Sequence, residues 1–270
     1  MKFIAKNQLF KPQERILLAV SGGVDSVVMA HLFFQANFLF GIAHCHFSLR
    51  PEADQEANLV SELAKKFSVP FFFRQFDTLH FAKNEKISIQ MAARHLRYDF
   101  FEEIRKQEKY DYIATAHHLN DSLETAIFNL AKGTGIAGLR GILPKNNTLI
   151  RPLLFATRKE IESFAQENKI VHLEDSSNHS DKYQRNFIRH QIIPRLSEQI
   201  NPNIVENFSE TAQKLIFTEK ILKKYFQDLQ NKIWREENNV FFLSFQEGKE
   251  ATILHYFLEP LGFSFRQCLQ

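Results

Sequence analysis

Short apolar runs alternate with helical patterns over the first two thirds of the chain. The continuous apolar runs predict strands at residues 15–20, 40–46, 69–76 and 110–116. Between and after them, apolar residues at helical spacing predict helices at residues 24–36, 55–67, 87–109 and 121–132. Strands that alternate with helices of this length form parallel sheets. We therefore expect an α/β fold, a Rossmann-like parallel sheet with helices on both faces.

The pattern changes near residue 200. Asn201-Pro202-Asn203 predicts a turn and a helix start, and apolar residues then recur every three or four positions. About 30 residues of such a helix would span roughly 45 Å, which is too long for a crossover helix. We expect one domain over residues 1–202 and the start of a smaller, mainly helical second domain over residues 203–270, with the sequence ending inside that second domain.

Composition places the protein among soluble globular proteins. Of its 270 residues, 44% are hydrophobic and 24% charged, which argues against disorder. Two cysteines, Cys45 and Cys268, cannot form a disulfide framework and indicate a reducing compartment. Because no run of 18 apolar residues and no signal core is found, we expect a cytoplasmic protein without a membrane span. The net charge of +3 permits a polyanionic partner without requiring one.

The turn after the first predicted strand has the composition of a phosphate-binding loop, formed by Ser21, Gly22, Gly23, Val24, Asp25 and Ser26. Glycines let the backbone approach a phosphate, successive amides form an anion nest, and the next helix adds its positive end. The negative charge of Asp25 would repel a phosphate bound here, unless Asp25 holds a divalent cation. A tight turn with an Asp-Ser cap is the alternative, and the pattern matches neither the kinase-type P-loop nor GxGxxG.

Two further segments place candidate ligands beside this loop. His44 and His46 end the second predicted strand and share one face. Since ligands bind at the carboxyl ends of parallel strands, a nucleotide contact is favoured there over a metal pair. Arg94 and Arg97 lie three residues apart on a predicted helix, where they face phosphate or an acid, or form a solvated basic stripe.

Acidic residues follow the fourth predicted strand. Asp121 and Glu124 fall in the first turn of a helix, after His117 and His118. Plain capping by the helix dipole is one interpretation. The other is that two carboxylates facing a strand-end cleft hold Mg²⁺ or an ammonium group, and the residues leave that choice open. A glycine-rich loop that begins with Lys132 and Gly133 is a second phosphate candidate.

A basic segment lies before the predicted second domain. Residues 182–195 contain four basic residues and no acid, interleaved with Tyr183 and Phe187. This composition is typical of a nucleic-acid phosphate patch, with an exposed basic helix as the alternative.

These motifs occur in one order that resembles a known family. Residues 21–26 resemble the pyrophosphate loop of the ATP pyrophosphatase superfamily. The ordered set resembles the bacterial tRNA(Ile)-lysidine synthetases, and its segments are residues 21–26, 43–50, 92–94, 117–125, 133–139, 151–153 and 175–189. The likeness covers about residues 10–200. One departure is His46-Phe47, where the family commonly has Asn-His, which puts a role for that histidine in doubt.

The resemblance implies a carbon–nitrogen ligase that uses ATP and Mg²⁺. Its partners would be L-lysine and the tRNA(Ile) with a CAU anticodon, and a homodimer is left open. Residues 1–202 would then be the catalytic domain, and the domain over residues 203–270 would contact the tRNA. The C2 oxygen of the wobble cytidine would be adenylated with release of pyrophosphate, and lysine would then expel AMP to give lysidine.

The site residues follow from this reaction. We expect catalytic roles for Asp25, Asp121 and Glu124 and Mg²⁺ ligands in Asp25 and Asp121. ATP contacts are expected at residues 21–26, His44, Arg94 and Gly133. Lysine and tRNA contacts are expected at His118, Asp121, Glu124, Lys132, Arg185, Asn186 and Arg189.

Three other functions fit the sequence less well. A tRNA thiolase of the same superfamily would need a cysteine pair to carry sulfur, and the sequence has no Cys-x-x-Cys. Amidotransferase-type synthetases need an ammonia-supplying domain that 270 residues leave no room for. The alternative from a different class is an ATP-binding or RNA-binding module without turnover, which pyrophosphate release with tRNA but without lysine would exclude.

Overall fold

The computed structural model describes residues 1–173, 184–237, 240–243, 251–258 and 265–268. The chain forms two compact units, residues 1–213 and 214–270, and each is described by itself. The division falls inside the long helix α11 (Ile204–Ile233), whose start agrees with the predicted helix start. The assignment of residues 203–270 to a tRNA-contacting domain stays a prediction.

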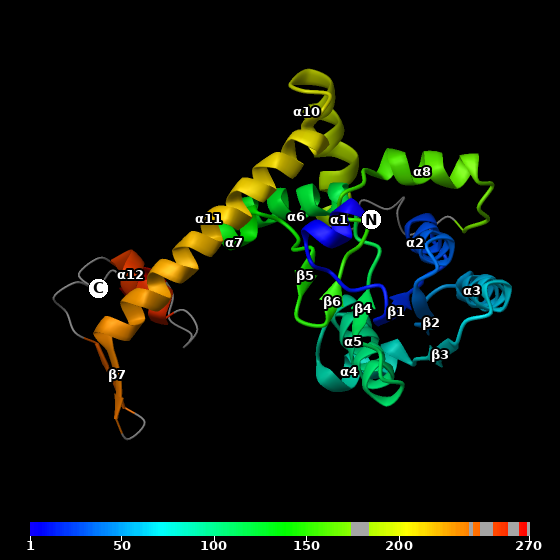
Figure 1. The fold of residues 1–270 in the computed structure, drawn as a ribbon, viewed down its shortest axis with the longest axis horizontal. Coiled ribbons are helices and arrows are strands. Elements are labelled where there is room, and N and C mark those ends of the chain that lie inside the picture. Colours follow the sequence, from blue (N-terminus) through cyan, green and yellow to red (C-terminus); the bar gives the residue numbers. More distant parts are fainter. Residues whose placement is uncertain (174–183, 238–239, 244–250, 259–264, 269–270) are drawn as a thin grey trace. The chain divides into compact units, whose positions relative to one another are not determined.

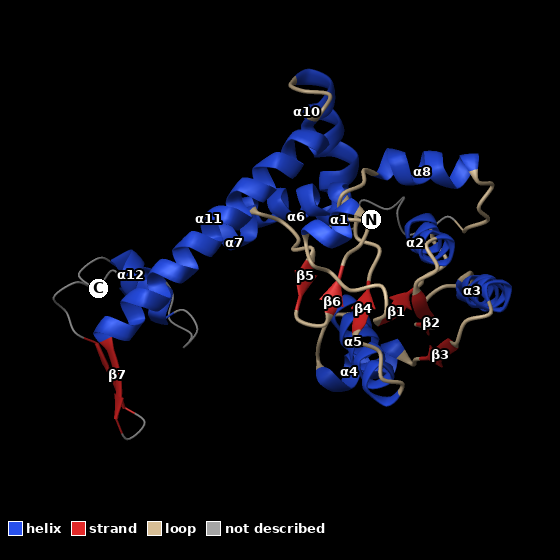
Figure 2. Ribbon diagram, in the orientation of Figure 1, coloured by secondary structure: helices blue, strands red, loops and turns tan. Residues whose placement is uncertain are grey.

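The first unit is built on a six-stranded sheet with the order β3-β2-β1-β4-β6-β5 (Figures 1 and 2). The strands are β1 (Arg15–Ala19), β2 (Leu39–His46), β3 (Phe71–Gln75), β4 (Tyr112–Ala114), β5 (Lys145–Asn146) and β6 (Leu149–Ile150). The four predicted strands are confirmed and pair in parallel. β6 also joins β4 in parallel, whereas β5 pairs antiparallel with β6. The sheet is therefore mixed rather than wholly parallel, because a hairpin closes one edge.

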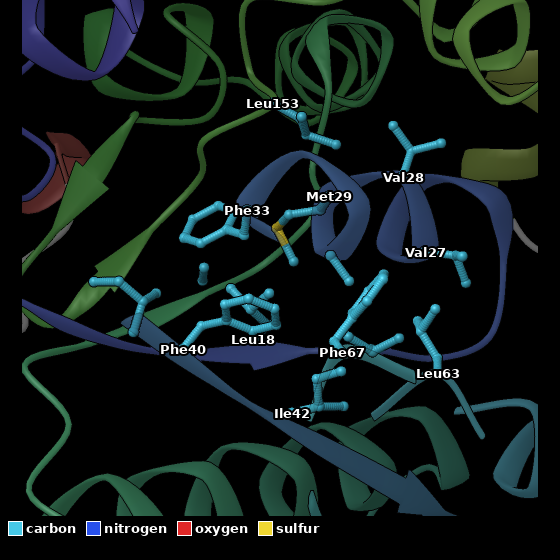
Figure 3. Packing of buried hydrophobic residues seen from close by; sticks show 14 of the residues in the cluster. Leu18, Val27, Val28, Met29, Phe33, Phe40, Ile42, Leu63, Phe67 and Leu153 are labelled. Carbon is cyan, nitrogen blue, oxygen red and sulfur yellow. The ribbon is translucent and has the colours of Figure 1, made fainter. Parts of the chain in front are cut away.

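Helices lie on both faces of this sheet, as predicted. One face carries α2 (Val24–Gln35) and α3 (Ala53–Phe67), with α8 (Arg158–Glu167) packed against α2. The other face carries α5 (Ile89–Gln107). Side chains alternate along β1, so Leu18 joins the first cluster and Leu17 the second. Figure 3 shows the first cluster, in which side chains of α2 lie over those of β1 and β2.

The first unit contains further helical elements, the last of which lead into α11. They are α1 (Lys2–Lys6), α4 (Thr78–Glu85), α6 (Leu119–Lys132), α7 (Ile136–Leu139), α9 (Gln184–Phe187), the π-helical turn η2 (Ile188–Ile192) and α10 (Ile193–Gln199). Leu123, Ile188 and Ile193 are buried together and contact the first residues of α11. The part of the predicted motif at residues 175–183 lies outside the described residues.

The second unit contains the remainder of α11, followed by β7 (Trp234–Glu237), β8 (Val240–Leu243), α12 (Ala251–Leu258) and α13 (Phe265–Cys268). β7 and β8 form an antiparallel hairpin. Leu229 of α11 and Phe257 of α12 are buried together, and the rings of Phe226 and Tyr256 stack at 3.8 Å. Among the described helices of both units, none is long and apolar enough to cross a membrane.

Gly41 of β2 lies directly against Tyr110, which precedes β4. A Cβ at this position would overlap the phenol oxygen of Tyr110 and lie 2.9 Å from its Cζ. Tyr110 is only 3% exposed, so its ring has little room to move. We expect Gly41→Ala to lower the free energy of unfolding by about 1–3 kcal/mol, measured by urea denaturation. The loss should shrink in a Tyr110→Phe background, and an equal loss in both backgrounds would contradict this explanation.

Candidate active site

The loop between β1 and α2 is held by its own hydrogen bonds. The backbone N–H of Ser21 donates to Ser26 Oγ at 3.1 Å, and the Ser26 hydroxyl donates to the Gly23 carbonyl at 3.0 Å. Gly22 has φ +99°, a conformation that side chains disfavour, and its carbonyl accepts the Leu173 N–H at 3.0 Å. Gly23 is the N-cap of α2, so unpaired N–H groups and the positive helix end gather here. This geometry suits a bound phosphate.

Asp25 is the one carboxylate within this loop. Its Oδ2 accepts a hydrogen bond from Nη1 of Arg158 at 2.6 Å, and its Oδ1 lies 3.8 Å from Nε2 of His118. That Oδ1 is buried and accepts no hydrogen bond from any described residue. Burial raises the pKa of Asp25, while His118 and Arg158 oppose the rise. A buried carboxylate oxygen without a donor suits a cation ligand.

Asp121 and Glu124 lie together at the start of α6, but their observed partner was not predicted. Arg189 donates to Glu124 through Nε at 2.7 Å and Nη2 at 3.0 Å, and its Nη2 reaches Asp121 Oδ1 at 3.1 Å. Asp121 Oδ2 also accepts the backbone N–H of His118 at 3.0 Å. Glu124 is 2% exposed, and this burial raises its pKa, against the effect of Arg189. The result is one guanidinium shared by two carboxylates.

These groups meet at a cavity of about 920 Å³. Its lining includes the residues that follow β1, β2 and β4, which is where open α/β sheets bind ligands. Of the predicted site residues, the lining contains Ser21, Gly23, Val24, Asp25, Ser26, His118, Asp121 and Arg189. Glu124 is joined to it through Arg189. The volume is at the upper end of the range for small-molecule sites.

Eight predicted site residues lie outside this lining in the described part of the chain: Gly22, Glu124, Arg185 and Asn186, and also His44, Arg94, Lys132 and Gly133. His44 is 1% exposed, and its Nδ1–H donates to the carbonyl of Val20 at 2.8 Å, so it braces the end of β1. The guanidinium of Arg94 lies 4.9 Å from the ring centre of Tyr98. Lys132 and Gly133 are both exposed at the end of α6. Their expected contacts with ATP or substrate stay predictions.

Arg185 and Asn186 belong to α9, beside the acidic pair. Arg185 donates to the hydroxyl of Thr125, which itself donates to the carbonyl of Asp121 at 2.7 Å. Arg185 is exposed and Asn186 half-buried. Both therefore lie near the acidic pair without lining the cavity, and their expected contact with tRNA stays a prediction.

Arg158 lines the cavity but was not predicted as a site residue, and Arg97, a candidate beside Arg94 for a phosphate contact, lines it whereas Arg94 does not. The exchange of hydrogen bonds between Thr157 and Glu160 marks the start of α8, and this Thr-x-x-Glu pattern is readable in a sequence. The pairing of Arg158 with Asp25, 133 residues away, has no local signal. Arg97 stacks 5.2 Å from the ring centre of Phe47, so it takes the place beside the cavity that was expected for Arg94.

His117 at the end of β4 makes the fold sensitive to acid. Burial lowers its pKa from 6.5 to about 4, with Asp121 opposing and Arg151 reinforcing the shift. Between these pH values the unfolded chain binds a proton that the folded chain does not, so this group costs stability as the pH falls. As the pH falls over that interval, we expect the free energy of unfolding to drop in both proteins. The drop should be on the order of 3 kcal/mol smaller for His117→Gln than for the parent, measured by urea denaturation. Equal losses would contradict the assignment.

Comparison with known proteins agrees with this geometry. Residues 1–196 match the family model of the PP-loop domain. The chain is 38% identical over 268 residues to the tRNA(Ile)-lysidine synthase of Porphyromonas gingivalis, covering 97% of this chain and 58% of that protein. It is 36% identical over 231 residues to that of Petrotoga mobilis, covering 84% of this chain and 74% of that protein. The chain spans 58% and 63% of the length of two of the curated relatives it matches.

Solved structures show the same fold. A U34-tRNA thiolase from Methanococcus maripaludis, solved with its [4Fe-4S] cluster, has a TM-score of 0.65 at 16% identity, covering 79% of this chain and 77% of that chain. At this identity the likeness concerns the fold alone, and it confirms the predicted PP-loop architecture. Together with the family match over residues 1–196, the identity to the Petrotoga mobilis relative shows that the chain belongs to the tRNA(Ile)-lysidine synthase family of PP-loop proteins.

Proposed function

We propose that this chain carries out ATP-dependent ligation of L-lysine to C2 of the wobble cytidine in the tRNA(Ile) with a CAU anticodon. The printed names of its relatives support this activity. The observation that carries the proposal is that two kinds of site meet at one cavity. The loop at residues 21–26 suits an anion, and the carboxylates of Asp121 and Glu124 accept hydrogen bonds from the guanidinium of Arg189. The loop suits the phosphates of ATP, and the pair suits an amine of lysine.

In the first step the C2 oxygen of cytidine attacks the α-phosphorus of ATP. The bond from that phosphorus to the α,β-bridging oxygen breaks, and pyrophosphate leaves. The backbone N–H groups of residues 21–26 and the hydroxyls of Ser21 and Ser26 hold the phosphates in line for attack. The base reaches the cavity from an unstacked anticodon loop, as single-stranded RNA recognition generally requires.

Asp25 and Asp121 are the residues that would hold Mg²⁺, which would neutralise phosphate charge in this step. The buried Oδ1 of Asp25, without a hydrogen-bond donor among the described residues, fits that role. No cluster of three or more His, Cys, Asp or Glu side chains in the described segments forms a complete metal cage. Two carboxylates are sufficient, because Mg²⁺ takes most of its remaining ligands from phosphates and water.

In the second step the ε-amine of lysine attacks C2, the bond from C2 to the AMP oxygen breaks, and AMP leaves. AMP is a far better leaving group than oxide, which is the reason for adenylating first. Asp121 and Glu124 orient lysine through its N–H groups. Glu124, whose pKa is raised by burial, takes the proton that the attacking amine loses.

Transfer RNA binding is assigned to each unit by itself. In the first unit we assign it to Arg185 and its neighbour Asn186 in α9, and in the second to cations of α11 that include the exposed Lys220 and Lys224. Such cations bind the RNA backbone by displacing condensed counterions. With a substrate of this kind, we propose that the protein is cytoplasmic.

Sulfur transfer is the nearest rival, and the cavity does not favour it. The chain contains two cysteines, and one of them, Cys45, lines the cavity. Burial raises the pKa of the Cys45 thiol to about 12, so it stays protonated at neutral pH. Sulfur chemistry requires the thiolate, which this environment suppresses.

Mass analysis of tRNA nucleosides decides between these functions. The tRNA is incubated with the protein, ATP and isotopically labelled lysine, and a transcript with a different wobble base serves as the control. We expect labelled lysine to be joined to the wobble cytidine with loss of one water, only when ATP is present. An unchanged cytidine, or a base in which sulfur replaces oxygen, would overturn the proposal.

A further inference from the structure

Arg189 occupies the place that the proposed function assigns to the amine of lysine. Its guanidinium donates to both Glu124 and Asp121, at distances from 2.7 to 3.1 Å. The two acidic side chains are 3% and 18% exposed, so few directions of approach remain for a second cation. While the guanidinium holds these oxygens, an ammonium group cannot take the same hydrogen bonds. Lysine must therefore compete with a residue of the protein itself.

The helical segment that carries Arg189 is fixed by the packing of its neighbouring residues. Residues Ile188–Ile192 form a π-helical turn, a feature that re-aims side chains and recurs at functional sites. Ile188 and Ile193 on either side are buried against Leu123 of α6. The side chain of Arg189, in contrast, is 32% exposed. Its long flexible stem can thus turn toward solvent while the helix stays in place.

The acidic pair needs such a cation when lysine is absent. Two buried carboxylates without a countercharge are costly. Arg189 supplies that countercharge and holds both side chains in place through its hydrogen bonds, at the expense of lysine affinity.

We propose that Arg189 is a built-in competitor for the amine subsite, filling it in the empty enzyme and swinging out when lysine binds. The proposal rests on the proposed function and deepens it. To displace Arg189, lysine must replace the hydrogen bonds that the guanidinium donates to both carboxylates.

Calorimetric binding of lysine at pH 8, without ATP or RNA, tests this. Removing the competitor in Arg189→Gln should tighten lysine binding at least tenfold, about 1.4 kcal/mol. Arg189→Lys keeps a competing cation and should bind lysine within about threefold of the parent. Arg105→Gln is the matched control, because it removes a paired arginine, bonded to Glu102 at 2.7 and 2.8 Å, that does not line the cavity. It should leave lysine affinity unchanged.

Unchanged or weaker lysine binding by folded Arg189→Gln would overturn the proposal. If tRNA affinity also falls, with a salt slope smaller by about one, the residue instead contacts an RNA phosphate. Should this variant unfold, lysine added during refolding should restore the fold better than sodium chloride of equal ionic strength, and no such rescue would count against the competitor role. If the parent protein forms no lysidine, the proposed function is rejected but the competitor role is not. Calorimetry measures lysine binding without the ligation reaction, so the two results are separate.

Discussion

Asp25→Asn should abolish adenylation while leaving the fold intact. The carboxylate lies within the phosphate-binding loop, with one buried oxygen free of hydrogen-bond donors from the described residues. The amide cannot replace its charge toward a cation, and we expect pyrophosphate release to fall by at least about 1000-fold. The fold should survive, because burial raises the pKa of Asp25 and so makes its ionised form a cost to stability rather than a gain.

The measurement is pyrophosphate release with tRNA and ATP, beside a thermal melt of each protein. Asp54→Asn is the matched control, since the Asp54 side chain is 86% exposed and pairs with His46. It should retain the parental rate. Parental adenylation by a folded Asp25→Asn protein would exclude Asp25 as a cation ligand.

Glu124→Gln should block lysine transfer but not adenylation. The buried carboxylate accepts hydrogen bonds from Arg189 in the empty site, and we assign to it the proton that the amine of lysine loses. Loss of a general base commonly costs 100-fold or more, so we expect the transfer step to slow by at least about 100-fold. Lysine affinity should change less than the rate of transfer. The substitution removes an acceptor from lysine, but it removes the same acceptor from the competing Arg189.

Accumulation of adenylated tRNA, followed by mass analysis, is the signature of this defect. Glu102→Gln removes an acid that pairs with Arg105 outside the cavity lining and should behave as the parent. If Glu124→Gln instead loses adenylation and needs more Mg²⁺, the residue holds the cation rather than lysine. Normal transfer with normal Mg²⁺ dependence would reject both roles.

Strong periodicity predicted the elements that are long and amphipathic. The helices predicted at residues 55–67 and 121–132 are α3 and α6, and each begins two residues earlier than predicted. Short elements carry too few residues for a period to show. The two-residue strands β5 and β6 and the eight-residue helix α4 were missed for that reason.

The candidate site divides in a similar way. The loop at residues 21–26 was predictable, because glycine content and a strand–turn–helix context are local properties. Asp121 and Glu124 were predictable as neighbours, because residues three apart share a helix face. The choice of Arg97 rather than Arg94 beside the cavity was not, because both lie on α5 and only its orientation against the sheet separates them.

The sequence by itself determined the order of strands and helices and the chemistry available after each strand, since both depend on residues close together in the chain. Only the tertiary structure decided which charges meet. Arg158 reaches Asp25 across 133 residues, and Arg189 reaches Glu124 across 65. Such pairs depend on strand order and on the placement of α8 and η2, which no local pattern encodes. The chain thus shows in its sequence that it can bind a phosphate, and only in its fold that an arginine already occupies the acidic pair.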